Sequence, residues 1–251
     1  MTRELRQALE RQYTDRRLAY RESLPWVRAR LRSRLRGRLE VARDLVAELC
    51  ATPGARRVLD FGSGDGELAD RIARAVPEGV AEIVGVDLVT SRVAGAEARY
   101  GHRGRVDVRF VAGDESSLPA QRGAGFDIVT CTATFCQAVD IYSLARGLHA
   151  ALAPRGHLVA EFANYAYFRH RLALLAGRIP RVSPAPMDLW PDIGWDSGNH
   201  NYTNYSMAVQ FLRQTGFHVV RMRPTGLVAN LMPILPSLFA TGFVFVARRD
   251  G

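Results

Sequence analysis

The sequence predicts an α/β fold: a mostly parallel sheet of seven strands with helices on both faces, preceded by a helical N-terminal extension. Between residues 56 and 163, apolar segments of strand length alternate with segments of helical periodicity. Those apolar segments carry few polar residues, as expected of strands buried on both faces. A glycine-rich bend joins the first strand to the first helix that follows it, which is typical of a ligand-binding sheet edge.

Residues 1–52 are expected to form the helical extension, with helices over 2–22 and 25–50. Pro25 suits the first turn of the second helix. Residues 1–43 hold 13 Arg and five acids, a net charge of +8, whereas the remainder holds 21 Arg and 20 acids. The arginines of residues 28–38 alternate and so spread around a helix, which favours a lid or dimer helix. A nucleic-acid-binding arm stays open as the alternative.

Residues 53–251 are expected to form the main domain, in which strands and helices follow in a regular order. The following strands are predicted by their apolar, β-branched runs: 57–61, 82–87, 106–111, 126–132, 157–163, 217–222 and 242–248. The following helices are predicted by their spacing of apolar residues: 67–76, 90–99, 140–153, 167–177 and 204–215. A loop rich in Pro, Trp, Asp and Gly spans 178–201, within an insertion over 164–203.

Several classes of protein are disfavoured by composition. The chain has no lysine, which excludes Schiff-base chemistry and a P-loop lysine. Cys50, Cys131 and Cys136 show neither metal-ligand nor disulfide spacing. Cys131 and Cys136 lie in an apolar segment, which predicts reduced, buried thiols and a cytoplasmic protein. The charged N-terminus lacks the apolar core of a signal peptide. Two prolines and an asparagine interrupt the apolar run 227–247, so we expect no membrane span there.

The glycine-rich bend Gly62, Gly64 and Gly66 lets backbone N–H groups approach a ligand closely. Asp60 precedes it and would repel a pyrophosphate, but suits a ligand ammonium group. Asp87 ends the next strand, about 20 residues on as in dinucleotide folds, where a carboxylate accepts ribose hydroxyls. Asp114 follows the third strand and can accept a hydrogen bond from an adenine amino group. Ammonium, ribose and adenine in this order indicate S-adenosylmethionine rather than NAD or ATP.

Over about residues 55–163 this pattern resembles the class I S-adenosylmethionine-dependent methyltransferases, which implies a Rossmann-like fold. The resemblance implies S-adenosylmethionine as methyl donor and S-adenosylhomocysteine as product. It implies that Gly62 and Gly64 contact the methionine part, Asp87 the ribose and Asp114 the adenine. The remaining cofactor-binding candidates, placed beside these groups, are Asp60, Ser63, Leu88, Glu115 and Thr132.

A second resemblance, to the methionine biosynthesis protein MetW family, extends past the fifth strand. The matching positions are Asn164, Arg171, Leu172, Leu174, Leu175, Gly177, Arg178, Pro180, Asp196, Asn199 and His200. Ala163 and Phe168 depart from that pattern, and the first 50 residues have no counterpart in the short members of the family. We therefore expect a relative with a different role, a small-molecule methyltransferase of secondary metabolism.

Methyl transfer is an in-line displacement with a neutral thioether leaving group, so positioning carries most of the catalysis. A base is needed only where the acceptor keeps its proton at neutral pH. The acceptor is expected beyond the fourth and fifth strands, bound by Phe135, Asn164, Tyr165 and Tyr202. The catalytic candidates are His200 first and His170 second as bases, with Tyr167 beside them.

Three functions follow from these patterns. The first is methyl transfer to O or N of a small organic acceptor. The second is RNA methylation with the basic arm, although "TCTATFC" (130–136) lacks the Asn/Asp-Pro-Pro-Tyr and Pro-Cys motifs of base methylation. The third, implied by the MetW resemblance, is a non-catalytic regulator of an acyltransferase partner. A homodimer is compatible with each of them.

Overall fold

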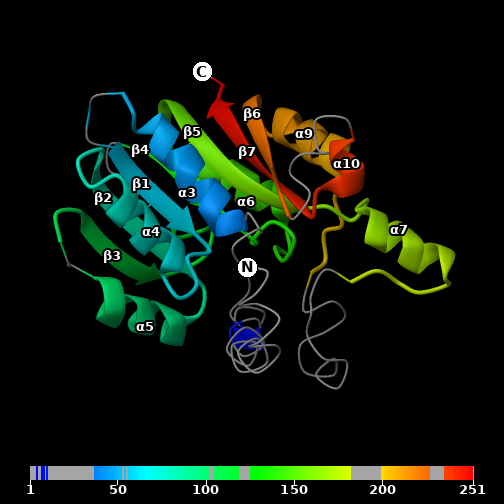
Figure 1. The fold of residues 1–251 in the computed structure, drawn as a ribbon. Coiled ribbons are helices and arrows are strands. Elements are labelled where there is room, and N and C mark those ends of the chain that lie inside the picture. The colour runs from blue at the N-terminus through cyan, green and yellow to red at the C-terminus, as the bar shows by residue number, and fades with distance from the viewer. Residues whose placement is uncertain are drawn as a thin grey trace.

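The computed structural model describes residues 37–52, 54, 56–101, 104–118, 125–181, 199–226 and 235–250, together with residues 4, 7, 8 and 10. Its centre is one seven-stranded sheet of order β3-β2-β1-β4-β5-β7-β6 (Figure 1). The strands are β1 Arg56–Phe61, β2 Val80–Asp87, β3 Asp107–Ala112, β4 Phe126–Cys131, β5 Leu152–Ala163, β6 Phe217–Thr225 and β7 Gly242–Arg249. The predicted number of strands is confirmed.

Six of the strands run parallel, and β7 runs antiparallel to its neighbours β5 and β6. The mostly parallel sheet is therefore confirmed as well. Because β1, β2, β3, β4 and β5 point the same way, their carboxyl ends meet at one edge, where ligands of such sheets bind. The glycine-rich bend and all three predicted carboxylates lie at this edge.

Helices cover both faces of the sheet (Figure 1). The first face carries α3 Arg38–Leu49, α4 Glu67–Ala75 and α5 Thr90–Tyr100, which pack on alternate strand residues such as Val58 and Val159. The second face carries α6 Ile141–Ala151 and α9 Tyr205–Gln214, whose apolar stripes bury Leu148 and Phe211. Two short helices, α7 Phe168–Leu175 and α10 Pro236–Phe239, lie near the carboxyl edge.

Four details of the predicted elements are wrong. The helix expected over 25–50 is not continuous, because the backbone of Gly37 is extended and α3 begins at Arg38; residues 25–36 lie outside the described part of the chain. Glycine is disfavoured in the interior of a helix and is well tolerated at the N-cap position. The fifth strand begins at Leu152 rather than 157, because Leu152 already pairs with Phe126 before a register shift. The sixth strand runs to Thr225 instead of ending at 222, and the short helix α10 was not predicted.

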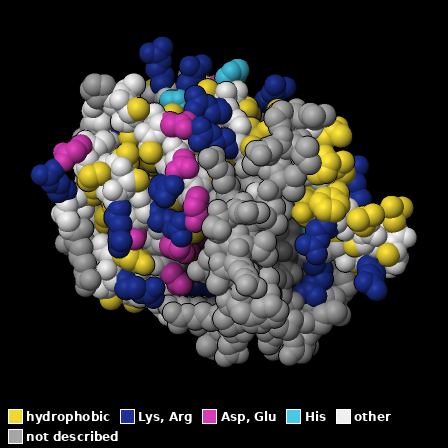
Figure 2. Space-filling view, viewed as in Figure 1, with side chains coloured by type: hydrophobic (Ala, Val, Ile, Leu, Met, Phe, Trp, Pro, Cys, Tyr) yellow, Lys and Arg dark blue, Asp and Glu magenta, His cyan; other side chains and the backbone are white. Residues whose placement is uncertain are grey.

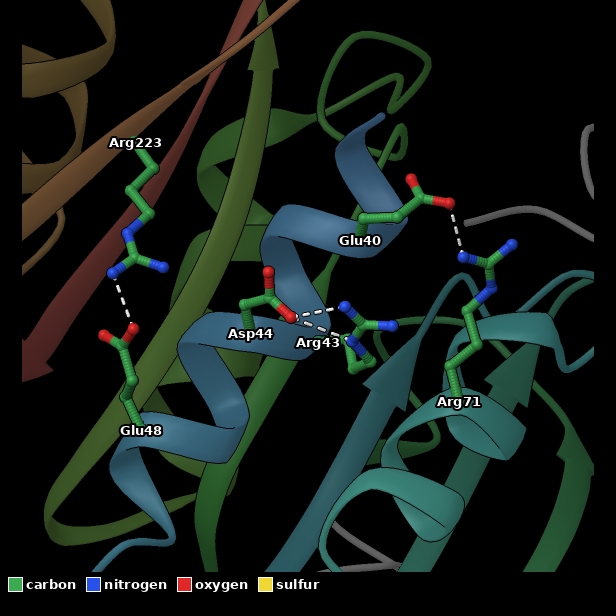
Figure 3. Close-up of polar contacts among 6 residues, drawn as sticks. All are labelled: Glu40, Arg43, Asp44, Glu48, Arg71 and Arg223. Atoms are coloured by element: carbon green, nitrogen blue, oxygen red, sulfur yellow. Dashed lines mark hydrogen bonds and ion pairs between the residues drawn. The ribbon is translucent and has the colours of Figure 1, made fainter. Parts of the chain in front are cut away.

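Helix α3 is held against the first face by its core and by ion pairs at both of its ends. Leu45 and Val46 are fully buried against the sheet. Glu40 accepts from Arg71 of α4, and Glu48 accepts from Arg223 of β6 (Figure 3). The helix therefore connects the half of the sheet that carries the glycine bend to the half that carries β6. Most of the predicted extension before it, including Tyr13 and Tyr20, lies outside the described residues.

None of the helices in the described part of the chain reaches the length and apolar content that crossing a bilayer demands. Within the apolar run 227–247, Gly242 begins the strand β7, as predicted, and residues 227–234 lie outside the described part. The thiol of Cys131 is completely buried, and burial raises its pKa well above the ordinary value. That thiol is therefore an inert part of the core. The same prediction is wrong for Cys136, which is only half-buried.

Candidate functional site

The bend after β1 takes a shape that only glycine adopts without strain. Gly62, Gly64 and Gly66 all have positive φ angles, of 74°, 55° and 80°. A Cβ on Gly62 would stand 2.1 Å from Oγ1 of Thr134, whereas the side-chain position of Gly64 has no heavy atom of the described residues within 4 Å. The backbone N–H groups of Gly62 and Ser63 donate to the carbonyl of Val86, which ties the bend to β2. The bend is thus rigid, and it is open at Gly64.

Asp60 lies at the carboxyl end of β1 and is 1% exposed. Its Oδ1 accepts a hydrogen bond from Oγ1 of Thr130 at 2.6 Å, while its buried Oδ2 has no partner in the described part of the chain. Burial, with a contribution from the charge of Asp87, raises the pKa of Asp60 to about 6, although the Thr130 hydrogen bond opposes the shift. An orphaned carboxylate oxygen at this place fits a cationic ligand group.

Asp87 ends β2 and is held by two backbone donors. Its Oδ2 accepts from the N–H of Gly64 at 2.8 Å, and its Oδ1 accepts from the N–H of Val89 at 2.9 Å. Burial raises the pKa of Asp87, opposed by these two hydrogen bonds and by the charge of Arg92. The carboxylate therefore links the glycine bend to the start of α5, with the half-buried Leu88 beside it.

Asp114 follows β3 and is 3% exposed. Its Oδ1 accepts from the N–H of Ser116 at 2.9 Å and from the hydroxyl of the same residue at 2.5 Å. The carbonyl of Asp87 accepts from the N–H of Gly113, which sets the two strand ends side by side. The half-buried Glu115 follows in the chain, and the buried Thr132 lies beyond the end of β4. The sheet order β3-β2-β1-β4 thus places the predicted cofactor residues in sequence along one edge.

The described residues of the extension also reach this edge. Glu4, Gln7, Ala8 and Glu10 are helical, and Oε1 of Glu10 accepts from the N–H of Thr90 at 3.1 Å. Thr90 begins α5, three residues after Asp87. This contact places part of the extension over the start of α5, next to the position predicted for the ribose.

Residues 199–203 join the segments that follow β4 and β5. The N–H of His200 donates to the carbonyl of Cys136 at 2.7 Å, and the side-chain amide of Asn201 donates to the carbonyls of Phe135 and Ala138. On the other side, the N–H of Tyr165 donates to the carbonyl of Thr203 at 2.9 Å. The segments after β4 and β5, which were predicted to meet on the acceptor side, are therefore linked by hydrogen bonds through residues 199–203.

These bonds gather four rings, which we name the aromatic cluster: Tyr165, Tyr167, His170 and Tyr202. The Tyr165 ring stands 4.4 Å from that of Tyr202 and 5.7 Å from the imidazole of His170. The Tyr167 ring lies 5.7 Å from the same imidazole, edge to face. All four were predicted from the sequence as substrate-binding or catalytic candidates, and the structure brings them together.

Three other candidates lie elsewhere. The ring of Phe135 is 2% exposed and stacks on Phe162 at 4.9 Å, within the core beneath α9. Asn164 is fully buried and donates to the carbonyls of Ser237 and Ala240, while its Oδ1 accepts from the N–H of Ala166. The side chain of His200 is exposed, although its backbone is bonded. Phe135 and Asn164 thus shape the edge from within.

Glu161 of β5 is a functional candidate that sequence reasoning missed. It is 8% exposed, and its Oε2 accepts from the N–H of Ala133 at 2.9 Å. Ala133 has a φ of 56°, a left-handed conformation that costs free energy outside glycine. Burial raises the pKa of Glu161, opposed by the charge of Arg38 and the Ala133 hydrogen bond. A lone acid within the apolar run "HLVAEFA" was the available signal.

The described residues fit S-adenosylmethionine on two observations of this structure. The unpartnered Oδ2 of Asp60 is a counter-charge for an ammonium group. The open side-chain position of Gly64 leaves room for close backbone approach. Among the described residues, no group of three or more His, Cys, Asp or Glu is arranged to hold a metal ion.

Comparisons with known proteins agree with this geometry. Residues 58–156 match a family described as "Methyltransferase domain". The release factor glutamine methyltransferase of Bordetella pertussis is 33% identical over 171 residues, covering 67% of this chain and 56% of its own length. The demethylmenaquinone methyltransferase of Roseiflexus castenholzii is 29% identical over 208 residues, covering 74% of this chain and 78% of its own length. The chain thus spans little more than half of the release factor enzyme.

Solved structures show the same fold. The magnesium protoporphyrin IX methyltransferase of Synechocystis PCC 6803, solved with bound S-adenosylhomocysteine, superposes with a TM-score of 0.62. The superposition covers 98% of both chains at 21% sequence identity. The seven-stranded sheet with its antiparallel β7 is therefore the class I methyltransferase fold.

Proposed function

Residues 58–156 match a methyltransferase domain and the sheet has the class I methyltransferase fold; from this premise we propose that the chain is an S-adenosylmethionine-dependent methyltransferase that methylates O or N of a small organic acceptor. Bound S-adenosylmethionine supplies an electrophilic methyl group whose departure leaves a neutral thioether. No residue has to protonate that leaving group. The work of this chain's residues is therefore to orient the donor, to align the acceptor and to take up a proton where the acceptor holds one.

On the donor side, we assign the Oδ2 of Asp60 to the ammonium group, since it is buried and has no partner in the part of the chain that the structure describes. We assign Asp87 to the ribose hydroxyls, because two backbone donors already fix its carboxylate beside the bend. Asp114, with Leu88 and Glu115 near it, is assigned to the adenine. The contact between Glu10 and Thr90 supports a lid role for the extension.

On the acceptor side, the observation that carries the proposal is the aromatic cluster. It lies past the end of β5, at the same sheet edge as the donor residues, and the bonds of residues 199–203 fix it there. Tyrosine rings offer flat apolar faces with a polar tip, which suit a small aromatic or heteroaromatic acceptor. His170 contacts two of the tyrosine rings, so we place it ahead of the exposed His200 as proton acceptor.

The names of the relatives support a small acceptor without identifying it. Demethylmenaquinone and magnesium protoporphyrin IX are small molecules, whereas a release factor is a protein. The resemblance to the MetW family supports a second candidate, a cofactor-binding regulator. In this structure the MetW-like Asn164 bonds three backbone groups, which is a structural task compatible with either function.

The proposal is tested by incubating the full chain with methyl-labelled S-adenosylmethionine and, separately, a panel of phenols, catechols and heteroaromatic amines, bulk RNA, and protein extract. Label in one of the small molecules, reduced at least tenfold in His170→Ala and unchanged in His218→Ala on β6, is the expected result. Label found only in RNA or only in protein would contradict the proposal and identify a macromolecular acceptor instead. Tight binding of S-adenosylhomocysteine without transfer to any fraction would favour the regulator.

A further inference from the structure

Helix α7 and the turn after it stand out from the fold, and we name residues 168–179 the α7 arm (Figure 1). None of the eight residues of α7 is buried. Leu172, Leu174 and Ile179 are 57%, 59% and 61% exposed, and Leu175 is 84% exposed. In the space-filling view, hydrophobic side chains gather on the same side of the molecule as this arm (Figure 2). Such a concentration of exposed leucines indicates an interaction surface.

The leucines of the arm do not form one stripe. At about 100° per residue, Leu172 and Leu174 point roughly 160° apart around the helix axis. A groove on a partner protein covers one side of a helix and would leave one of these leucines in water. The last four residues of α7 are Leu172, Ala173, Leu174 and Leu175, so its C-terminal turn is apolar on every side and suits a medium that surrounds it.

The charge of the arm is of one sign. Residues 162–181 contain no Asp or Glu, and the arm itself carries Arg169, Arg171 and Arg178. Nε of Arg171 donates to the carbonyl of Ala166 at 2.7 Å, which directs this guanidinium back toward the base of the arm. Arg169 and Arg178 are exposed. Within α7 the arginines lie in the first turn and the exposed leucines in the last, so charged and apolar groups are separated along the helix as phosphates and acyl chains are separated in a bilayer.

We propose that the α7 arm binds the surface of an anionic lipid bilayer, with Leu174 and Leu175 below the headgroups and the arginines among the phosphates. An eight-residue helix is about 12 Å long, which suits interfacial insertion and is far too short to span. The arm starts directly after the aromatic cluster, at Phe168. The inference rests on exposure and charge and holds whether or not the chain transfers methyl groups.

The test is co-sedimentation of the full chain with extruded vesicles, either of phosphatidylcholine alone or with a third of phosphatidylglycerol. The expected result is binding to the anionic vesicles that weakens several-fold between about 0.05 and 0.3 M salt. Little binding to neutral vesicles is expected. A chain that stays in the supernatant with both vesicles would overturn the proposal.

Variants locate the contact. The double variant Leu174→Ser, Leu175→Ser is expected to lower the partition coefficient at least tenfold, and Arg169→Gln with Arg178→Gln at least threefold. Val220→Ser removes another exposed apolar side chain, on β6, and is expected to bind as the parent does. If the leucine variant bound anionic vesicles as the parent does, the α7 arm would not be the membrane contact. A dimer in vesicle-free solution that this variant alone dissociates would also contradict the proposal, because the arm would then be a contact between copies of the chain.

Discussion

At the scale of single residues, the two carboxylates beside the glycine bend are held differently, and this predicts different behaviour. Both oxygens of Asp87 accept backbone hydrogen bonds, whereas one buried oxygen of Asp60 has no partner among the described residues. Burial disfavours the charge of Asp60 more strongly than its single hydroxyl donor favours it. Asp60 is therefore a residue kept for a ligand at the expense of stability.

Asp60→Asn should stabilise the ligand-free protein at alkaline pH. The folded-state pKa of about 6 lies above the ordinary 3.8, so the stability that Asp60 contributes is full below about pH 4 and is lost as pH rises through 6. At pH 8 the variant should gain up to about 3 kcal/mol in free energy of unfolding, and near pH 4 almost nothing. Urea titrations at both pH values check this; a variant no more stable at pH 8 contradicts it. The variant should also bind S-adenosylhomocysteine at least tenfold more weakly.

Asp87→Ala should abolish binding of S-adenosylhomocysteine in calorimetry, because it removes the carboxylate assigned to the ribose and frees the N–H of Gly64. The far-ultraviolet circular dichroism spectrum should stay that of the parent protein. Glu78→Ala is the matched control, since its ion pair with Arg105 is exposed and Glu78 precedes β2, at the opposite end of this strand from Asp87. Equal affinities of the parent and Asp87→Ala would discredit the assigned donor site.

At the scale of elements, Asn164 connects the end of β5 to α10 and to the start of α7. Its side-chain amide bonds the carbonyls of Ser237 and Ala240 and the N–H of Ala166, and its backbone N–H donates to the carbonyl of Thr241. The residue was predicted to bind substrate, whereas in the structure its side chain links β5 to the neighbouring elements through hydrogen bonds. Its effect on any acceptor site therefore passes through the elements that it holds.

Asn164→Ala should lower the free energy of unfolding by about 2–4 kcal/mol, because it leaves the buried carbonyl of Ala240, the part-buried carbonyl of Ser237 and the N–H of Ala166 without their partner. Gln210→Ala on the exposed side of α9 should change it by less than about 0.5 kcal/mol. Chemical denaturation monitored by fluorescence measures both. If the two variants had the same free energy of unfolding, the hydrogen bonds of Asn164 would not stabilise the fold as stated.

Most elements, and the location of Asp60 and Asp87 at the ends of strands, could be predicted from the sequence, because the alternation of apolar strands and helices fixes where each strand stops. The acceptor side was harder to predict. Phe135 turns into the core after the left-handed Ala133, a conformation that the sequence does not reveal. Glu161, which bonds that residue, was hidden because its partner lies 28 residues away.

At the scale of the whole molecule, the order β3-β2-β1-β4-β5 lines up donor residues and aromatic cluster along one edge, and α3 bridges the sheet through Glu40 and Glu48. A ligand held by β1, β2 and β3 together contacts segments far apart in the chain. It should therefore stabilise the folded protein as one unit.

S-adenosylhomocysteine at 100 times its dissociation constant should raise the free energy of unfolding by about 2.7 kcal/mol, seen as a shift of the melting temperature by several degrees. The shift should vanish in Asp87→Ala. NADH at the same concentration should produce none, because Asp60 would repel its pyrophosphate. A shift with NADH alone would point to a different nucleotide.

The most direct test is a crystal structure of the full chain with S-adenosylhomocysteine. We expect its ammonium nitrogen within hydrogen-bond distance of Oδ2 of Asp60, its ribose hydroxyls on Asp87 and its adenine beside Asp114, with the sulfur facing the aromatic cluster. A nucleoside bound at any other place, or one that leaves Asp60 and Asp87 without contact, would contradict this expectation.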